Sequence, residues 1–318
     1  MTGPSPTGSV SVVVCAYTLD RWADLTAAVD SVRTQVPAPS ELVLVIDHND
    51  ELLARASAAW PDVEVLASAG PPGLTGARTT GVEAARGEIV AFLDDDARAE
   101  PGWLAALVEP YRDARVVATG GWAIAAWDGG RPAWFPEEFD WVVGCSHRGL
   151  PTTEATVRNP IGSTMSFRRA AVREAGGFRP EIGRVGRHPV GGEETELCIR
   201  IGAARPDSRV VLAPPARVRH RVPVSRGRWR YFIARCYQEG RSKALISRLA
   251  GAGPALESER RYTVRVLPAG VLRGLAATLR GHPSGLLRAA AIAVGLGVTT
   301  AGFVAGRTGI DPLPAPRA

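Results

Sequence analysis

Short apolar runs alternate with stretches of helical spacing through the first hundred residues. The runs lie at 9–16, 41–47, 63–67 and 89–93 and are rich in valine and isoleucine. Between them, apolar residues recur every three or four positions, which is the spacing of an amphipathic helix. Strands that alternate with helices predict a parallel sheet, and runs that are apolar at nearly every position predict a sheet covered on both faces. The sequence therefore indicates a three-layer α/β domain. Further strands are predicted at 116–119, 210–213 and 218–222, and residues 120–162, which lack clean periodicity, are predicted to be irregular.

Polar residues gather where three of these runs end. They are Tyr17, which follows Ala16, then Asp47, then the triplet Asp94, Asp95 and Asp96. Because ligands of such sheets bind at the carboxyl ends of the strands, we expect the functional site there. Adjacent carboxylates repel one another unless a cation or hydrogen-bond donors stabilise them, and hard oxygen ligands suit Mg²⁺ or Mn²⁺. The triplet predicts a divalent metal site; the alternative is that one or two of the acids cap the following turn.

Two other α/β enzyme classes do not match the pattern of the sequence. A phosphatase of the haloacid type carries its acid pair after the first strand, whereas the triplet ends about the fourth. The first run leads into YTLDRW at 17–22, which lacks the G-x-G-x-x-G of a dinucleotide site.

Five segments of the chain resemble the family 2 glycosyltransferases of the GT-A fold, over roughly residues 9–245. They are VVVCAYTLDRW, VIDHND, GARTTGVEAARGEIVAFLDDD, NPIGSTMSFRRAAVREAGGF and GGEETELCIR. The resemblance implies a GT-A-type three-layer αβα domain with a mainly parallel central sheet. It also implies an inverting enzyme that moves a sugar from a nucleotide-diphosphate donor, expected to be a UDP-sugar. The expected acceptor is a hydroxyl of a glycan or polyprenyl-linked saccharide in cell-surface polysaccharide or glycoconjugate assembly.

The same resemblance assigns residues to the donor side of the site. The nucleotide-binding set is Ala16, Tyr17, Asp47, Arg78, Asp94 and Asp95, with Asp47 at the nucleotide base. In the D-x-D motif, Asp96 would hold Mg²⁺ or Mn²⁺ directly, and Asp94 directly or through water. His220 falls where several related enzymes carry a histidine near the metal or diphosphate, although a lone histidine between strand residues is more often a packed side chain.

The segment GGEETELCIR resembles the family's E-D-x-E-L motif, whose second acid usually serves as the base. Glu194 is therefore the expected catalytic base, able to take the proton of an acceptor hydroxyl during attack. Glu193 stays open as the alternative, because this chain has Glu194 where aspartate is commoner, and both acids would also be favourable in a first helical turn. Gly162 and Ser163 are expected on the acceptor side, together with Trp134, whose ring could stack on a sugar or belong to a core.

Charge divides the chain unevenly. Residues 216–318 carry 18 lysines and arginines against 4 acids, while the remainder carries 20 against 28. The spacing predicts a basic amphipathic helix over 264–280, and residues 289–305 are uncharged, just short of the roughly 20 that span a bilayer. Basic charge beside an apolar stretch suits an anionic membrane surface. The alternative is a helical tail packed on the catalytic domain or on a dimer partner.

The expected organisation is a loose leader at 1–8, a glycosyltransferase domain at 9–248 and a basic, apolar helical extension at 249–318 that can associate with a membrane. The four cysteines form no C-x-x-C pair and favour a reducing compartment, so we expect the enzyme at the cytoplasmic face of the cell membrane. A sugar nucleotidyltransferase is the competing enzyme class, but it would carry a glycine-rich triphosphate loop where this chain has YTLDRW. A basic nucleic-acid-binding protein is the other alternative, and the acidic first two-thirds argues against a nucleic-acid partner. The sequence leaves the oligomeric state open.

Overall fold

The computed structural model describes residues 8–180, 182, 191–250 and 259–309. The leader expected at 1–8 therefore lies, except for Gly8, outside the described residues. Contacts divide the chain into two compact units. The first comprises Met1–Ile124, Pro151–Gly186 and Glu193–His220, and the second comprises Ala125–Leu150, Arg187–Gly192 and Arg221–Ala318. The domain limits expected from the sequence stay a prediction.

A mixed sheet runs through the first unit. Nine strands within the described residues form it in the order β3-β2-β1-β4-β8-β6-β9-β5, and β7 pairs with β9. The parallel strands are β1 Val10–Ala16, β2 Glu41–Ile46, β3 Glu64–Ala67 and β4 Ile89–Asp94. The strands with antiparallel partners are β5 Ala97–Ala99, β6 Val116–Trp127, β7 Ala155–Val157, β8 Thr164–Arg168 and β9 Arg209–Val222. The four apolar runs of the sequence thus form the parallel half, and the antiparallel strands extend it.

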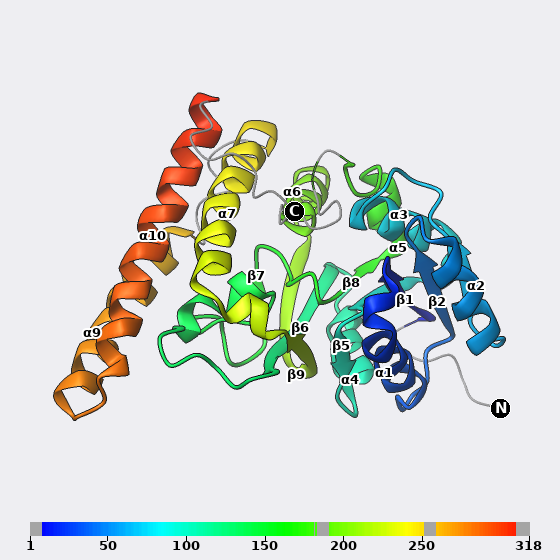
Figure 1. Ribbon diagram of the computed structural model, residues 1–318. Helices are drawn as coiled ribbons and strands as arrows, with labels where there is room; N and C mark the ends of the chain where they lie inside the picture. The colour runs from blue at the N-terminus through cyan, green and yellow to red at the C-terminus, as the bar shows by residue number, and fades with distance from the viewer. Residues whose placement is uncertain (1–7, 181, 183–190, 251–258, 310–318) are drawn as a thin grey trace. The chain divides into compact units, whose positions relative to one another are not determined.

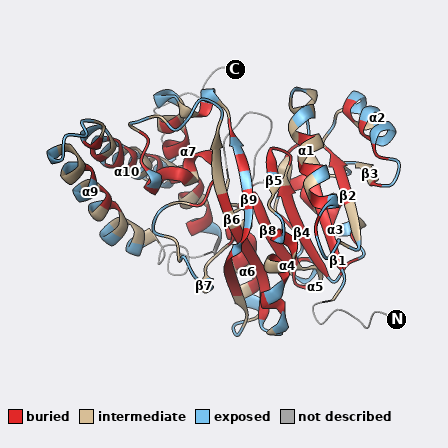
Figure 2. Ribbon diagram, turned by 90° about the horizontal axis from the view of Figure 1, so that it is seen from below, coloured by how far each residue is buried: buried red, intermediate tan, exposed pale blue. Residues whose placement is uncertain are grey.

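Helices cover both faces of this sheet (Figure 1). One core contains apolar residues of α1 Trp22–Arg33, α2 Asp50–Ala59 and α4 Trp103–Val108. The other contains apolar residues of α3 Leu74–Ala84, α5 Arg169–Glu174 and α6 Glu193–Ala204. Along β1, Val12 and Val14 enter the first core and Val13 enters the second, because successive side chains of a strand point to opposite faces. The strands are accordingly buried (Figure 2), and the expected three-layer arrangement is confirmed.

The structure differs from the sequence-based expectation in the length of β6. A strand was expected at 116–119 and irregular chain from residue 120, yet β6 continues to Trp127. The strand pattern is interrupted in the sequence at Gly120 and Gly121. Glycines have no side chain, so they do not show the alternation of inward and outward side chains that indicates a strand. Close packing requires them: a Cβ on Gly121 would lie 2.3 Å from the carbonyl oxygen of Ala216.

The second difference is that β9 is a single strand where two were expected, at 210–213 and 218–222. Pro214 and Pro215 suggested a break, since proline donates no ladder hydrogen bond. In the structure, β7 pairs with residues 210–212 of β9 and β5 pairs with residues 218–220. The prolines fall between these two pairings, so their missing donors do not interrupt the ladder to either strand.

The second unit packs around an aromatic core. Its helices are α7 Trp229–Ala250, a π-helical turn Tyr262–Val266, α9 Leu267–Leu279 and α10 Ser284–Thr308. Phe135, Phe139 and Phe232 are fully buried in this core, and Leu267 and Ile292 join them from α9 and α10. The basic helix expected over 264–280 is therefore present as the last part of the π-helical turn followed by α9.

Glycines bring the backbones of these helices into contact. A Cβ on Gly302 of α10 would lie 2.1 Å from the carbonyl oxygen of Tyr237 in α7, and one on Gly285 would lie 2.3 Å from that of Gly274 in α9. Figure 1 shows α10 running along α7. By length and composition, α10 is the one described helix that could cross a membrane, with 28% of its most apolar window buried.

Candidate active site

The acidic triplet lies where β4 ends. Asp94 is the last residue of β4, and Asp95 and Asp96 lead directly into β5. Because Ala97 of β5 pairs with His220 of β9, the histidine is brought beside the acids from a distant part of the chain. His220 Nε2 lies 3.1 Å from Asp96 Oδ1 and 3.9 Å from Asp94 Oδ2. The three residues expected to hold a metal are therefore adjacent.

This cluster fits a divalent cation. One donor atom from each of Asp94, Asp96 and His220 lies within 4.8 Å of the others. Carboxylate oxygens suit Mg²⁺ and Mn²⁺, and an imidazole nitrogen is a ligand for transition metals. Asp96 and His220 are buried, while the side chain of Asp94 is 28% exposed, so the cluster is open on one side. Three protein donors leave room for phosphate oxygens or water on a six-coordinate ion.

Arg21 stabilises the two acids that follow Asp94. Its Nη1 lies 2.8 Å from Asp95 Oδ1 and 3.2 Å from Asp96 Oδ2. Burial raises the pKa of Asp95 to about 7, the neighbouring charge of Asp96 acts in the same direction, and Arg21 opposes both. Arg21 is not among the site residues predicted from the sequence, although it lies in the polar YTLDRW turn. The acidic triplet could have indicated such a residue, because buried carboxylates require a nearby cation.

Arg78 joins three parts of the site from α3. Its side chain is 2% exposed, and it donates to Glu193 Oε1 at 2.6 Å, to the carbonyl oxygen of Gly162 at 2.9 Å and to Asp94 Oδ1 at 3.3 Å. Burial alone would lower the pKa of Arg78, but Glu193 and Asp94 raise it above its ordinary value. The guanidinium therefore ties the start of α6 to the end of β4 and to the loop before β8.

The two neighbouring glutamates have different surroundings. Both belong to the first turn of α6, which follows Gly192 in a left-handed conformation, φ +103°. Glu193 is buried and ion-paired with Arg78, and its Oε2 makes no hydrogen bond within the described residues. Glu194 is half-buried. Glu194 is therefore the more accessible of the two carboxylates.

Ala16, Tyr17 and Asp47 meet at the carboxyl ends of β1 and β2. The backbone N–H of Asp47 donates to the carbonyl oxygen of Ala16 at 2.8 Å, and Asp47 Oδ2 accepts from the N–H of Gly73 at 2.9 Å. Tyr17, the next residue after Ala16, is 38% exposed. The donor-side residues thus share one edge of the sheet, as expected for strands with parallel neighbours.

The three acceptor-side residues fall in different units. Gly162 and Ser163 lie beside Asp94: the carbonyl oxygen of Gly162 accepts from Arg78, which also binds Asp94, and the carbonyl oxygen of Ser163 accepts from the N–H of Asp94 at 3.4 Å. Trp134 belongs to the second unit, where its ring contacts Phe135, Trp229 and Phe232. The role expected for each site residue stays a prediction.

A family model and two relatives of known function all match this chain as a glycosyltransferase. The family model described as "Glycosyl transferase family 2" matches residues 11–176. The chain is 37% identical over 244 residues to the glucosyl-dolichyl phosphate glucuronosyltransferase of Haloferax volcanii, covering 76% of this chain and 78% of that protein. It is 28% identical over 182 residues to the pre-mycofactocin glycosyltransferase of Mycobacterium tuberculosis, covering 56% of this chain and 37% of that protein.

Solved structures agree on the fold. The mannosyltransferase PcManGT from Pyrobaculum calidifontis, in complex with GDP-Man and Mn²⁺, superimposes with a TM-score of 0.60 at 18% identity, over 95% of this chain and 89% of that one. GalNAc-T7 with UDP, GalNAc and Mn²⁺ superimposes with a TM-score of 0.50 at 22% identity, over 68% of this chain and 43% of that one. The GT-A fold expected from the sequence is confirmed.

Proposed function

The chain belongs to glycosyl transferase family 2, and from this membership we propose that it moves a sugar from a UDP-sugar or related nucleotide donor to a lipid-linked saccharide. The family itself makes the chain a glycosyltransferase and sets aside the nucleotidyltransferase and nucleic-acid-binding alternatives. The observation that carries the proposal is the cluster of Asp94, Asp96 and His220 at the carboxyl edge of the parallel strands. The lipid-linked acceptor is supported by the Haloferax volcanii relative, whose name specifies a dolichyl phosphate substrate.

Donor binding would use the edge formed by β1, β2 and β4. Asp47, held by the N–H of Gly73, is assigned to the nucleotide base, with Ala16 and Tyr17 beside it. Asp94, Asp96 and His220 would hold Mg²⁺ or Mn²⁺. When bound, such an ion offsets the negative charge that develops on the diphosphate leaving group. Arg21 keeps Asp95 and Asp96 in place, because its guanidinium lies against both carboxylates.

Proton removal is assigned to Glu194. Arg78 binds Glu193 Oε1 within the protein, so Glu193 acts on the site by positioning Arg78 and, through it, Asp94 and Gly162. Glu194 lies on the same helical turn and is the more exposed of the two acids, since it is half-buried and Glu193 is buried. A carboxylate there takes the proton of the acceptor hydroxyl while its oxygen attacks the anomeric carbon. Attack opposite the leaving diphosphate inverts the anomeric configuration.

Attachment to the cytoplasmic membrane surface is proposed for α9 and α10. Leu272 and Leu279 of α9 are 66% and 90% exposed, and Leu286 and Leu287 at the start of α10 are 54% and 56% exposed. Residues 260–310 contain seven arginines and no acid. An exposed apolar face flanked by arginines supplies the two signals that stable attachment to anionic lipid needs. One face of α10 packs on α7 through Gly302, which favours surface attachment over a span.

A donor screen tests the proposal. We expect one nucleotide-sugar in a panel of UDP- and GDP-sugars to be slowly hydrolysed by the full-length protein, and only when Mn²⁺ or Mg²⁺ is present. Asp96→Asn serves as the inactive control. Absence of binding and hydrolysis for the whole panel with both metals would contradict the donor assignment.

A further inference from the structure

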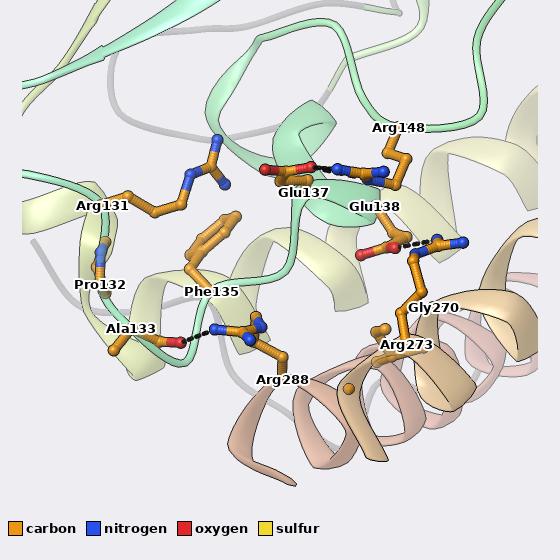
Figure 3. A pocket seen from close by; sticks show the side chains of 12 residues that line it. Arg131, Pro132, Ala133, Phe135, Glu137, Glu138, Arg148, Gly270, Arg273 and Arg288 are labelled. Atoms are coloured by element: carbon orange, nitrogen blue, oxygen red, sulfur yellow. Dashed lines mark hydrogen bonds and ion pairs between the residues drawn. The ribbon is translucent and has the colours of Figure 1, made fainter. Parts of the chain in front are cut away.

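A cavity of about 430 Å³ lies inside the second unit, and the proposed active site uses none of its residues. It is bounded by the chain from Arg131 to Arg148 on one side and by α9 and α10 on the other (Figure 3). Its arginines are Arg131, Arg148, Arg273 and Arg288. Its volume is within the range of about 300–1,000 Å³ that is usual for small-molecule sites.

Three of the four arginines are ion-paired. Arg131 binds both carboxylate oxygens of Asp140 at 2.7 Å, and Arg148 binds Glu137. Arg273 binds Glu138, whose side chain is 7% exposed. The two-pronged bond to Asp140 occupies both terminal nitrogens of Arg131. These three pairs neutralise the acids around the cavity, so the acids do not repel an incoming anion.

The fourth arginine leaves the cavity positively charged. Arg288 Nη1 donates to the carbonyl oxygen of Ala133 at 3.2 Å and to Ser284 Oγ at 3.1 Å, both neutral acceptors. Within the described residues it forms no ion pair with a carboxylate. Figure 3 shows Arg288 reaching toward the Ala133 carbonyl at the lower edge of the cavity. Its charge is therefore available to an anionic ligand.

Arg273 adds donors on the α9 side of the cavity. It binds Glu138 through Nη2 alone, at 2.5 Å, and its side chain is 47% exposed. A guanidinium carries five N–H donors in a planar fork, so Arg273 can hold Glu138 and still donate to a second group. Paired or forked arginine donors match the oxygens of a phosphate well.

The helices that carry these two arginines also carry exposed leucines. Leu272 precedes Arg273 on α9, and Leu287 precedes Arg288 on α10; both leucines are more than half exposed. Gly274 and Gly285 bring the backbones of α9 and α10 into contact. A ligand with a phosphate group and a long apolar chain would meet cations inside the cavity and apolar side chains outside it.

We propose that this cavity binds the phosphate group of a lipid phosphate, the class to which a phospho-lipid-linked acceptor belongs. The inference rests on the proposed function for the identity of the lipid, and on the arginines and leucines of α9 and α10 for the binding. It gives the second unit a part in substrate recognition besides membrane attachment.

Binding of farnesyl phosphate to the full-length protein in detergent tests the proposal, measured by calorimetry without donor or metal. Farnesol and inorganic phosphate are the two partial ligands. We expect farnesyl phosphate to bind at least about tenfold more tightly than either, because charged hydrogen bonds and apolar burial both contribute. Arg288→Gln should weaken farnesyl phosphate binding by about tenfold or more. Arg280→Gln, at the exposed residue that follows α9 and lies outside the cavity, should change binding less than twofold.

A second variant guards against loss of folding. Arg273→Gln combined with Glu138→Gln removes a lining cation without leaving a buried carboxylate unpaired, and it should also weaken binding. Equal losses in Arg288→Gln and Arg280→Gln would overturn the cavity assignment, and inorganic phosphate that binds as tightly as farnesyl phosphate would overturn the lipid assignment. Metal-dependent donor hydrolysis should persist in Arg288→Gln, so failure of this inference is distinguishable from failure of the proposed function.

Discussion

Arg78 Nη1 donates a 2.6 Å hydrogen bond to Oε1 of Glu193, and both side chains are buried. The pair connects α3 to the first turn of α6 within the first unit. A buried carboxylate that is ion-paired in this way stabilises the fold. The adjacent Glu194 is half-buried and can meet an acceptor, so the two neighbouring acids should respond differently to the same substitution.

Glu194→Gln should lower kcat by at least the roughly hundredfold typical of a lost general base. Donor affinity should stay near that of the wild type, because the change removes a proton acceptor and no donor contact. Glu193→Gln should instead lower stability, by about 3–5 kcal/mol, since it leaves the buried Arg78 without its closest anion. Steady-state kinetics and thermal unfolding of both variants check this. A folded, inactive Glu193→Gln beside an active Glu194→Gln would reverse the assignment.

Asp96→Asn should abolish Mn²⁺ binding and metal-dependent turnover while the fold persists. The substitution removes one ligand of the Asp94, Asp96 and His220 cluster and keeps the volume of the side chain. Mn²⁺ binding is measured by electron paramagnetic resonance. Asp62→Asn is the matched control, because Asp62 is an exposed acid paired with Arg33. Equal Mn²⁺ affinity for the wild type and Asp96→Asn would contradict the metal assignment.

The parallel half of the sheet was predictable because its strands are apolar at nearly every position. The expected runs at 41–47 and 89–93 differ from β2 and β4 by one residue each. The antiparallel half was harder, because Gly120 and Gly121 hide the alternation of β6 and Pro214 and Pro215 suggested a break in β9. In both cases strand pairing, which is not local in the sequence, decides the structure.

The same holds for the site: residues within a continuous motif could be predicted, whereas contacts between residues far apart in the sequence could not. A continuous motif such as Asp94, Asp95 and Asp96 could be read directly, and the family resemblance located His220 beside it. The ion pairs could not be read in this way. Arg21 and its partner Asp95 are 74 positions apart in the sequence, and Arg78 and its partner Glu193 are 115 positions apart. No spacing in a single sequence indicates such pairings, so the ion pair of Glu193 with Arg78 is seen only in the structure.

Gly302→Ala should lower the free energy of unfolding by about 1–3 kcal/mol, which is usual for overpacking. Its Cβ would lie 2.1 Å from the carbonyl oxygen of Tyr237, so α10 must move away from α7. Gly297→Ala on the same helix is the control, since its Cβ would meet no atom within 4 Å. That control should be neutral or gain up to about 1 kcal/mol from helix propensity. Thermal unfolding measures both, and equal effects would contradict the close contact between α7 and α10.

Glu41 should make the stability of the first unit sensitive to acid. Burial alone would raise its pKa, but hydrogen bonds from Ser11 Oγ and from the backbone of Arg86 and Gly87 lower the pKa below its ordinary value of 4.5. A pKa that is lower in the folded state gives stability above pH 4.5 that is lost as the pH falls through the folded-state pKa. Glu41→Gln should therefore cost about 1–3 kcal/mol at pH 7 and much less at pH 3. Urea unfolding at both pH values checks this, and an equal cost at both would refute it.

Transfer of labelled sugar to a lipid is the most direct test of the central claim. The full-length protein is incubated with Mn²⁺, the donor found by the screen and anionic vesicles that contain a polyprenyl-phosphate-linked saccharide. We predict labelled lipid with the wild type, with anomeric configuration opposite to that of the donor, and none with Asp96→Asn or after removal of the metal. Label that appears only in a soluble acceptor, or equal labelling of lipid by Asp96→Asn, would contradict the account.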